Sequence, residues 1–358
     1  MNLIICDNLK ELRKNKANTQ EDLAEFLSVS ITAVSKWERG ECYPDIELLP
    51  RISAYYDVSV DDLLGVGEIR KQERIKEYEE KSRKFCNIGD RKSDLELWRE
   101  ARMEFPNNWT VLYNLQNAMY YFWRDEGITR EVIEIGEKIL SQCTDNDYRY
   151  SVIQTMCYLY SNMGEFEKAK EYVEMAPTYV VSRNMLRSHV LKGDEWFTHI
   201  QHNIVWLCEE LAEHIWIYVR SGNLEYEAAK ALLYKALKIY ELVYENGDYG
   251  FYNDRLDTIY TTLAVKAANQ SLLNETIENL SNAVKHAIKF DITEELIHTS
   301  TLVNRMEYNR KGIQKSEMSN NSYDKLQALN DERYDFCCGD ERFIKLLEDL
   351  KKVAVSGE

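Results

Sequence analysis

The stretch TQEDLAEFLSVSITAVSKWERG, residues 19 to 40, determines the fold of the N-terminal part of this 358-residue chain. Its pattern predicts two short helices joined by a tight turn. Thr19 can cap the first helix, and Asp22, three residues later, complements the helix dipole. Ser30 offers a second cap directly before ITAVSKWE. The spacing predicts a helix-turn-helix, in which the second helix enters the major groove of DNA and the first lies across the phosphate backbone.

The second of these helices has two different sides. Val34 and Trp37 are three residues apart, so they lie on one side and are expected to face the core. The other side is small and mixed in polarity, which suits base edges better than a protein core. It consists of Ile31, Thr32, Ser35 and Lys36.

Residues 4 to 65 resemble the Xre-type helix-turn-helix domain of phage repressors and bacterial regulators. The resemblance is carried by the segments TQEDLA, VS, SKWERG and VSVDDLL at their expected separations. It implies an N-terminal five-helix, lambda-repressor-like domain. Ser28 departs from the family pattern, because the turn usually has a glycine there to accept a positive φ. The resemblance implies DNA contacts by Gln20 and Arg39 to the backbone and by Ile31, Thr32, Ser35 and Lys36 to bases, and a structural ion pair between Arg13 and Glu38.

The acidic composition argues against nucleic-acid binding through the whole surface. The net charge is -16, and residues 1 to 66 contain 7 Lys and Arg against 12 Asp and Glu, a net charge of -5. The basic residues are nevertheless concentrated in the first helix and at the end of the recognition helix. We therefore expect a local positive strip, weak non-specific DNA binding, and a homodimer that binds a palindromic double-stranded operator.

The remainder of the N-terminal region completes a domain over residues 1 to 66. Residues 7 to 16 predict a first helix, and Asp45 is expected to cap a fourth helix, IELLPRISAYY, which Pro50 should distort. Residues 59 to 64 predict a fifth helix that stops at Gly65. Gly65-Val66-Gly67 is expected to act as a hinge, followed by a charged helical linker over residues 67 to 84.

Residues 85 to 358 predict a second all-α domain, a tetratricopeptide-like α-solenoid. The clearest unit spans residues 147 to 177, with an aromatic-rich helix, a turn at Gly164 and a second helix that ends before Pro177. The segments TVLYNLQNAMYYF and YRYSVIQTMCYLY are 38 residues apart, close to the repeat length of this family. No strand-like alternation is seen. Looser copies begin at Gly222 and Thr258.

No catalytic, cofactor or metal site is predicted. The chain has no P-loop, dinucleotide fingerprint, nucleophile elbow or zinc-protease motif. His199, His202, Cys208 and His214 could be drawn as a metal cluster, but exposed helix histidines are the better interpretation. The eight cysteines are scattered, and no segment reads as a membrane span or secretory signal, so a cytoplasmic protein is expected.

The repeat domain leaves several functions open. Asn114 and Asn117 could bind a peptide backbone through their amides, although asparagines on an exposed helix face are ordinary. By architecture the chain resembles peptide-sensing regulators, which favours a transcriptional regulator whose repeat domain mediates dimerisation and senses a short peptide or protein. The alternatives are a DNA-tethered protein-interaction scaffold without a small ligand, and an enzyme of unrecognised type, which no motif supports.

Overall fold

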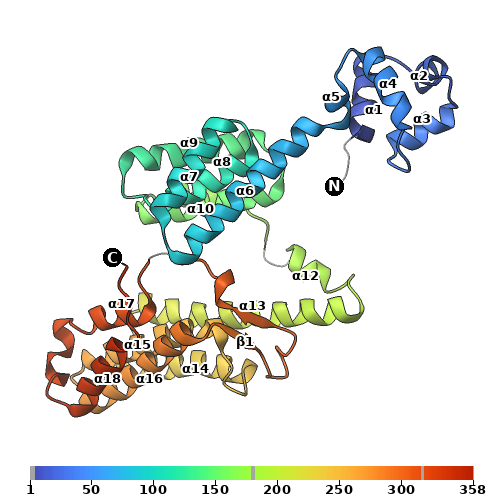
Figure 1. Cartoon of the computed structure of the whole chain (residues 1–358). Helices are drawn as coiled ribbons and strands as arrows, with labels where there is room; N and C mark the ends of the chain where they lie inside the picture. The colour runs from blue at the N-terminus through green and yellow to red at the C-terminus, as the bar shows by residue number, and fades with distance from the viewer. Residues whose placement is uncertain (1–4, 179–181, 316–317, 358) are drawn as a thin grey trace. The chain divides into compact units, whose positions relative to one another are not determined.

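The computed structural model describes residues 5–178, 182–315 and 318–357, and this part of the chain is almost entirely helical (Figure 1). Two compact units are formed by Met1–Lys81 and Ser82–Glu358. The predicted all-α fold is confirmed, an N-terminal helix-turn-helix unit followed by helical repeats. The first unit contains α1 (Ile5–Asn15), α2 (Gln20–Leu27), α3 (Ile31–Glu38), α4 (Leu49–Tyr56), α5 (Val60–Leu64) and the start of α6 (Val66–Ile88).

The first unit packs its helices around one small apolar core. Leu9 of α1, Val34 of α3 and Ile52 of α4 are fully buried in it. The complete cluster is Ile5, Leu9, Leu23, Ala24, Leu27, Val34, Trp37, Ile52, Tyr56 and Leu63. Because every helix from α1 to α5 contributes to this core, the position of α3 is fixed from several sides.

Pro50 does not distort a helix as predicted. Asp45 caps a separate 3₁₀ turn, Ile46–Leu48, and α4 begins only at Leu49, so Pro50 falls in its first turn. Amides of the first turn have no carbonyl partner within their helix, so a proline costs no hydrogen bond there. The segment predicted as one fourth helix is therefore a 3₁₀ turn followed by a shorter α-helix, and Pro50 is accommodated without a kink.

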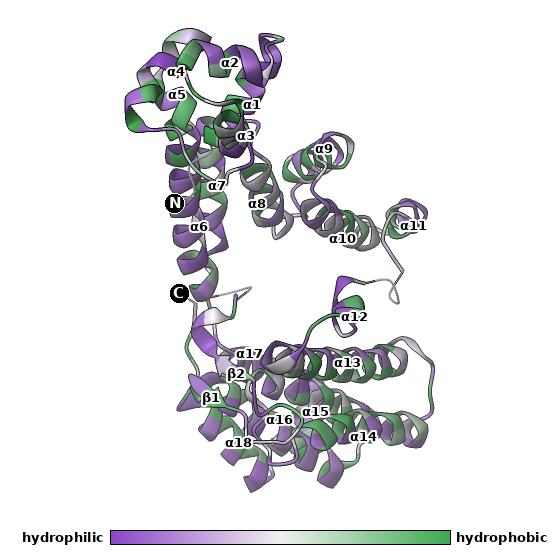
Figure 2. Cartoon of the chain, turned by 90° about the vertical axis from the view of Figure 1, so that its right-hand side faces the viewer, coloured by the Kyte–Doolittle hydropathy of each residue, from purple (hydrophilic) through white to green (hydrophobic). Residues whose placement is uncertain are grey.

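The predicted hinge is largely helical. Gly65 ends α5 with φ of 70°, but Val66 and Gly67 are already the first residues of α6. The linker predicted over residues 67 to 84 lies entirely within this one charged helix, which is mostly hydrophilic in Figure 2.

The second unit begins with antiparallel helices in the order expected of helical repeats. They are α7 (Arg91–Glu104), α8 (Trp109–Tyr120), α9 (Glu126–Gln142), α10 (Asn146–Asn162) and α11 (Phe166–Val173). The unit read from residues 147 to 177 corresponds to α10 and α11, joined by a turn at Gly164 with φ of 78°. The 38-residue offset is visible in a hydrogen bond, with 2.8 Å between Thr110 Oγ1 of α8 and Tyr148 Oη of α10.

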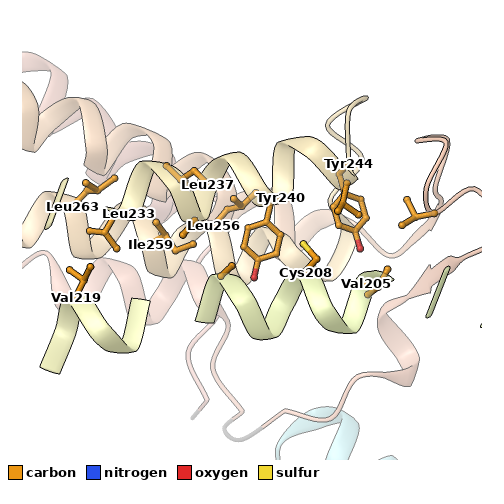
Figure 3. Packing of buried hydrophobic residues seen from close by; sticks show 14 of the residues in the cluster. Val205, Cys208, Val219, Leu233, Leu237, Tyr240, Tyr244, Leu256, Ile259 and Leu263 are labelled. Carbon is orange, nitrogen blue, oxygen red and sulfur yellow. The ribbon is translucent and has the colours of Figure 1, made fainter. Parts of the chain in front are cut away.

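Further helix pairs complete the second unit. They are α12 (Arg183–Arg187), α13 (Gly193–Ser221), α14 (Tyr226–Val243), α15 (Asn253–Ala268), α16 (Leu273–Ile292), α17 (Asn321–Ala328) and α18 (Glu341–Lys351). Cys208 of α13, Tyr240 of α14 and Leu256 of α15 meet in a common core (Figure 3). Figure 2 shows hydrophobic and hydrophilic faces on these helices, as amphipathic packing requires.

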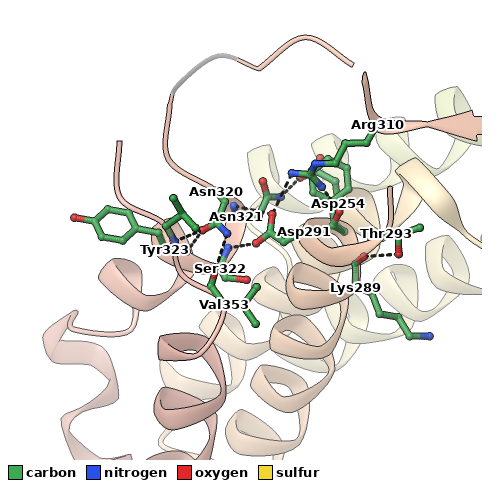
Figure 4. A network of polar contacts seen from close by, with 12 residues as sticks. Asp254, Lys289, Asp291, Thr293, Arg310, Asn320, Asn321, Ser322, Tyr323 and Val353 are labelled. Atoms are coloured by element: carbon green, nitrogen blue, oxygen red, sulfur yellow. Dashed lines mark hydrogen bonds and ion pairs between the residues drawn. The ribbon is translucent and has the colours of Figure 1, made fainter. Parts of the chain in front are cut away.

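A small β-hairpin interrupts the helices, although the sequence of this region shows no strand-like alternation. β1 (Glu295–Ile297) pairs antiparallel with β2 (Glu307–Asn309), with Leu296 opposite Tyr308. Three-residue strands are too short for alternation to be recognised in the sequence. A buried carboxylate nearby, Asp291, accepts hydrogen bonds from the backbone amides of Asn321 and Ser322 and pairs with Arg310, which fixes the start of α17 (Figure 4).

Candidate nucleic-acid interface

Two caps and a left-handed turn position α2 and α3. Thr19 and Asp22 form a capping box, with 3.1 Å between Asp22 N and Thr19 Oγ1 and 2.7 Å between Thr19 N and Asp22 Oδ2. Ser30 caps α3 by accepting from Ala33 N at 3.2 Å. Between them, Ser28 adopts φ of 59° and ψ of 41°, the conformation that the family's glycine supplies. Serine therefore keeps this turn, at some conformational cost.

One side of α3 is packed and the other is open. Val34 and Trp37 are buried, at 0% and 6% exposure. Ile31, Thr32 and Lys36 are exposed, and Ser35 is half-buried. Lys36 makes no side-chain hydrogen bond or ion pair with any residue that the structure describes. The four side chains predicted to face bases thus share one accessible side of a helix whose rear is fixed in the core.

Arg13, Gln20 and Glu38 form a network that joins α1, α2 and α3. Arg13 donates to Glu38 twice, at 2.6 and 2.9 Å, and its side chain is 14% exposed against 4% for Glu38. Gln20 Nε2 donates to the same carboxylate at 2.8 Å. Burial alone raises the pKa of Glu38, but the hydrogen bonds from Arg13 and Gln20 outweigh it and lower the pKa below the ordinary glutamate value. The network holds Gln20 at the start of α2.

Arg39, expected at the DNA backbone, has partners within its own segment. It donates to Glu41 at 2.6 Å and also to Ser35 Oγ, and its hydrogen bond with Glu41 raises the pKa of Arg39. Both members of this ion pair are half exposed. An exposed pair of this kind is weak, so a phosphate can replace Glu41 as the partner of the guanidinium.

Two further residues, which the sequence did not indicate, donate hydrogen bonds to carbonyl oxygens at helix ends in the first unit. Arg51 of α4 donates to the carbonyl oxygens of Phe26 at 2.8 Å and Leu27 at 3.4 Å, and so satisfies the end of α2. Asn8 of α1 donates to the carbonyl oxygen of Asp62 at 3.0 Å and so satisfies the end of α5. Both contacts join residues more than twenty positions apart, and no local pattern indicates them.

The two asparagines predicted to bind a peptide lie half-buried on α8. Asn114 donates to the carbonyl oxygen of Thr110 in its own helix at 2.9 Å. Asn117 Oδ1 accepts from Thr155 of α10 at 3.4 Å. The structure therefore gives both side chains intramolecular partners and does not bring them together in a cavity described for this chain.

Two of the histidines that were considered and rejected as metal ligands form hydrogen bonds with backbone carbonyl groups. His199 Nε2 donates to the carbonyl oxygen of Asn184 at 2.8 Å, and His214 Nδ1 to that of Glu210 at 2.7 Å. Among the described residues, no three His, Cys, Asp or Glu side chains are grouped so that they could hold a metal ion.

Within the residues that the structure describes, no helix combines the length and apolar character needed to cross a bilayer.

The geometry of α2 and α3 defines a helix-turn-helix protein. A family model described as Helix-turn-helix matches residues 9–63. The transcriptional activator BcrR of Enterococcus faecalis is 49% identical over 63 residues, 18% of this chain and 31% of that protein. The regulator ImmR of Bacillus subtilis is 39% identical over 64 residues, 18% of this chain and 50% of that protein.

A third relative extends the match. YqaE of Bacillus subtilis, an uncharacterised helix-turn-helix transcriptional regulator, is 33% identical over 84 residues, 24% of this chain and 68% of that protein. The chain belongs to the Xre-type helix-turn-helix family of transcriptional regulators. Its match spans only a third to a half of the length of BcrR and ImmR. These relatives are described as regulators of transcription and not as enzymes.

One solved structure is similar over a longer part of the chain. The crystal structure of Bacillus thuringiensis PlcR in complex with the peptide PapR7 and DNA covers 79% of this chain and 93% of that chain, at 16% identity and a TM-score of 0.35.

Proposed function

We propose that this protein is a sequence-specific DNA-binding transcriptional regulator that reads its operator with the exposed side of α3. The observation that carries the proposal is the open face of Ile31, Thr32, Ser35 and Lys36 on a helix whose rear is buried. Lys36 is free to donate to the acceptor edge of a guanine, and the Ile31 and Thr32 methyl groups suit the methyl of thymine. Gln20 and Arg39 are proposed to contact the phosphate backbone.

Selection from a random duplex pool tests this proposal. The purified full-length protein is incubated with the pool, and the retained duplexes are sequenced. We expect an enriched motif with two related half-sites about 10 to 11 base pairs apart. Retention without enrichment of any motif would contradict sequence-specific recognition.

We propose that the working form is a homodimer joined through the repeat domain. A single module of this size reads few base pairs, so a second copy on the other half-site supplies the remaining specificity. A second copy is needed all the more because the net negative charge of the chain weakens its sequence-independent attraction to DNA phosphates. The proposed dimer surface is an apolar stripe on α13, defined by Leu207, Leu211 and Tyr218, which are 42%, 56% and 60% exposed.

We also propose that the repeat domain senses a short peptide or a protein segment. Stacked helix pairs form extended surfaces suited to a linear chain. By linkage, a ligand that changes operator affinity must have its own affinity changed by the operator to the same degree. A partner that binds equally well with and without operator would instead favour the scaffold alternative.

A further inference from the structure

A positively charged groove lies along α13, α15 and α17 in the second unit. Its main cavity has a volume of about 520 Å³ and is lined from α13, α15, α17 and the 3₁₀ turn Glu332–Cys337. Four of its ten lining residues are basic and none is acidic: Arg220, Lys266, Lys325 and Arg333. In a chain with a net charge of -16, such a lining is a local exception.

Two of these four cations form ion pairs with a carboxylate, one pair buried and one exposed. Lys325 pairs with the buried Asp257 at 2.7 Å, and Arg333 pairs with Asp331 at 2.7 Å. Arg220 and Lys266 form no ion pair with a described residue. The Arg220 guanidinium lies over the Trp216 ring, 5.1 Å from its centre, which orients the charge without cancelling it. The groove therefore holds two uncompensated positive charges.

The threonines of the groove cannot supply further donors, because their hydroxyl protons are engaged. Thr262 accepts from Trp216 Nε1 at 2.8 Å and donates to the carbonyl oxygen of Thr258 at 2.9 Å. Thr258 and Thr261 donate to Asp254 and Asp257, each at 3.1 Å. The groove donors that no described residue engages are those of Arg220, Lys266 and the exposed amide of Asn269, together with Nη1 of Arg333, whose other nitrogens donate to Asp331. Two cations and one amide match the acceptor oxygens of a carboxylate.

A smaller cavity of about 60 Å³ adjoins the first and shares Trp216 and Thr258 with it. Its walls include the apolar side chains of Ala212, Tyr240 and Ile259, beside which an apolar group can be held. Two charged residues, Glu213 and Arg255, also line it, and the Arg255 guanidinium is paired with Glu209 at 3.0 Å. An apolar side chain next to a carboxylate is the chemistry of the last residue of a peptide.

We propose that this groove binds the C-terminal carboxylate of a short peptide, with Arg220 and Lys266 as its charge partners and the smaller cavity taking part of the last side chain. The inference rests on the proposed function, in which the repeat domain senses a peptide. It adds which end of the peptide is recognised and by which residues.

Two pools of short random peptides test this inference on the full-length protein. One pool has free C-terminal carboxylates and the other has amidated C-termini. The retained peptides are measured by mass spectrometry for the parent, for the double variant R220Q/K266Q, and for the control K235Q/K238Q. The control removes two exposed lysines of α14 that form no ion pair with a described residue and lie outside the groove.

We expect the parent and the control to retain carboxylate peptides about tenfold more than amides, because charged hydrogen bonds are lost with the amide. R220Q/K266Q should lose this preference. Equal retention of the two pools by the parent, or a preference that survives R220Q/K266Q, overturns the inference and leaves peptide sensing standing. If the parent retains no peptide from either pool, peptide sensing fails and the inference fails with it.

Discussion

Glu38 is the residue on which the arrangement of the first three helices depends. Its carboxylate accepts two hydrogen bonds from Arg13 and one from Gln20. In Glu38→Gln the nearly buried Arg13 loses its anionic partner, so we expect a loss of about 3 kcal/mol in the stability of this unit. Hydrogen exchange followed by mass spectrometry on peptides from residues 5 to 64 measures it. Glu41→Gln, which removes the exposed partner of Arg39, is the control and should change little.

The same residue predicts a pH dependence. Because the folded pKa of Glu38 is lower than that of the unfolded chain, its contribution is fully present above the unfolded value of about 4.3 and is lost as pH falls through the lowered pKa. Protection in the parent should therefore decrease more steeply below that pH than in Glu38→Gln. Equal slopes would show that Glu38 is not the responsible group.

Replacing Gln20 should change the affinity for DNA more than the stability of the unit. Gln20→Ala removes one of three hydrogen bonds to Glu38 and leaves the Arg13 pair intact. Since phosphate contacts position the protein without reading sequence, we expect weaker binding to selected and scrambled duplexes by the same factor. Fluorescence anisotropy with both duplexes measures the two losses. A loss confined to the selected duplex would make Gln20 a base contact instead.

At the scale of elements, close helix approach limits what the repeats tolerate. A Cβ on Gly136 of α9 would lie 2.5 Å from Gln116 Nε2 and 2.8 Å from Met156 Sδ. Gly136→Ala should therefore destabilise the α8–α10 packing by about 1 to 3 kcal/mol, measured by hydrogen exchange in those helices. Gly67→Ala in α6 is the matched control, because a Cβ there meets nothing within 4 Å. It should be neutral or stabilising.

The elements also show which parts of the fold are readable from sequence. Thr19, Ser30 and Ser59 act within one turn of their own position, so their caps follow from local pattern. The hairpin at 295 to 309 has strands of only three residues, and the start of α4 is displaced by a 3₁₀ turn within an otherwise continuous helical pattern, so neither was recognised. The groove at Arg220 and Lys266 needed the structure, because α13 and α15 must be packed together before their charges can be compared.

At the scale of the whole molecule, the α13 stripe predicts an oligomer. Leu211→Glu places a charge within the proposed dimer surface, so we expect a dimer at micromolar concentration for the parent and a monomer for the variant. Analytical ultracentrifugation distinguishes them. Leu242→Glu is the control, an equally large change at a leucine of α14 that is 73% exposed and outside the stripe. A parent that is monomeric both alone and with the selected duplex would rule out the dimer.

The central claim, that α3 reads DNA sequence, is tested most directly by an affinity ratio. The ratio of dissociation constants for scrambled and selected duplexes is measured at one salt concentration, for the parent and for the triple variant I31A/T32A/K36A. These three residues are exposed and outside the core, so the fold should be kept. We predict a ratio of about 10³ or more for the parent and a ratio near one for the variant. A variant that keeps the parent's ratio would contradict the claim.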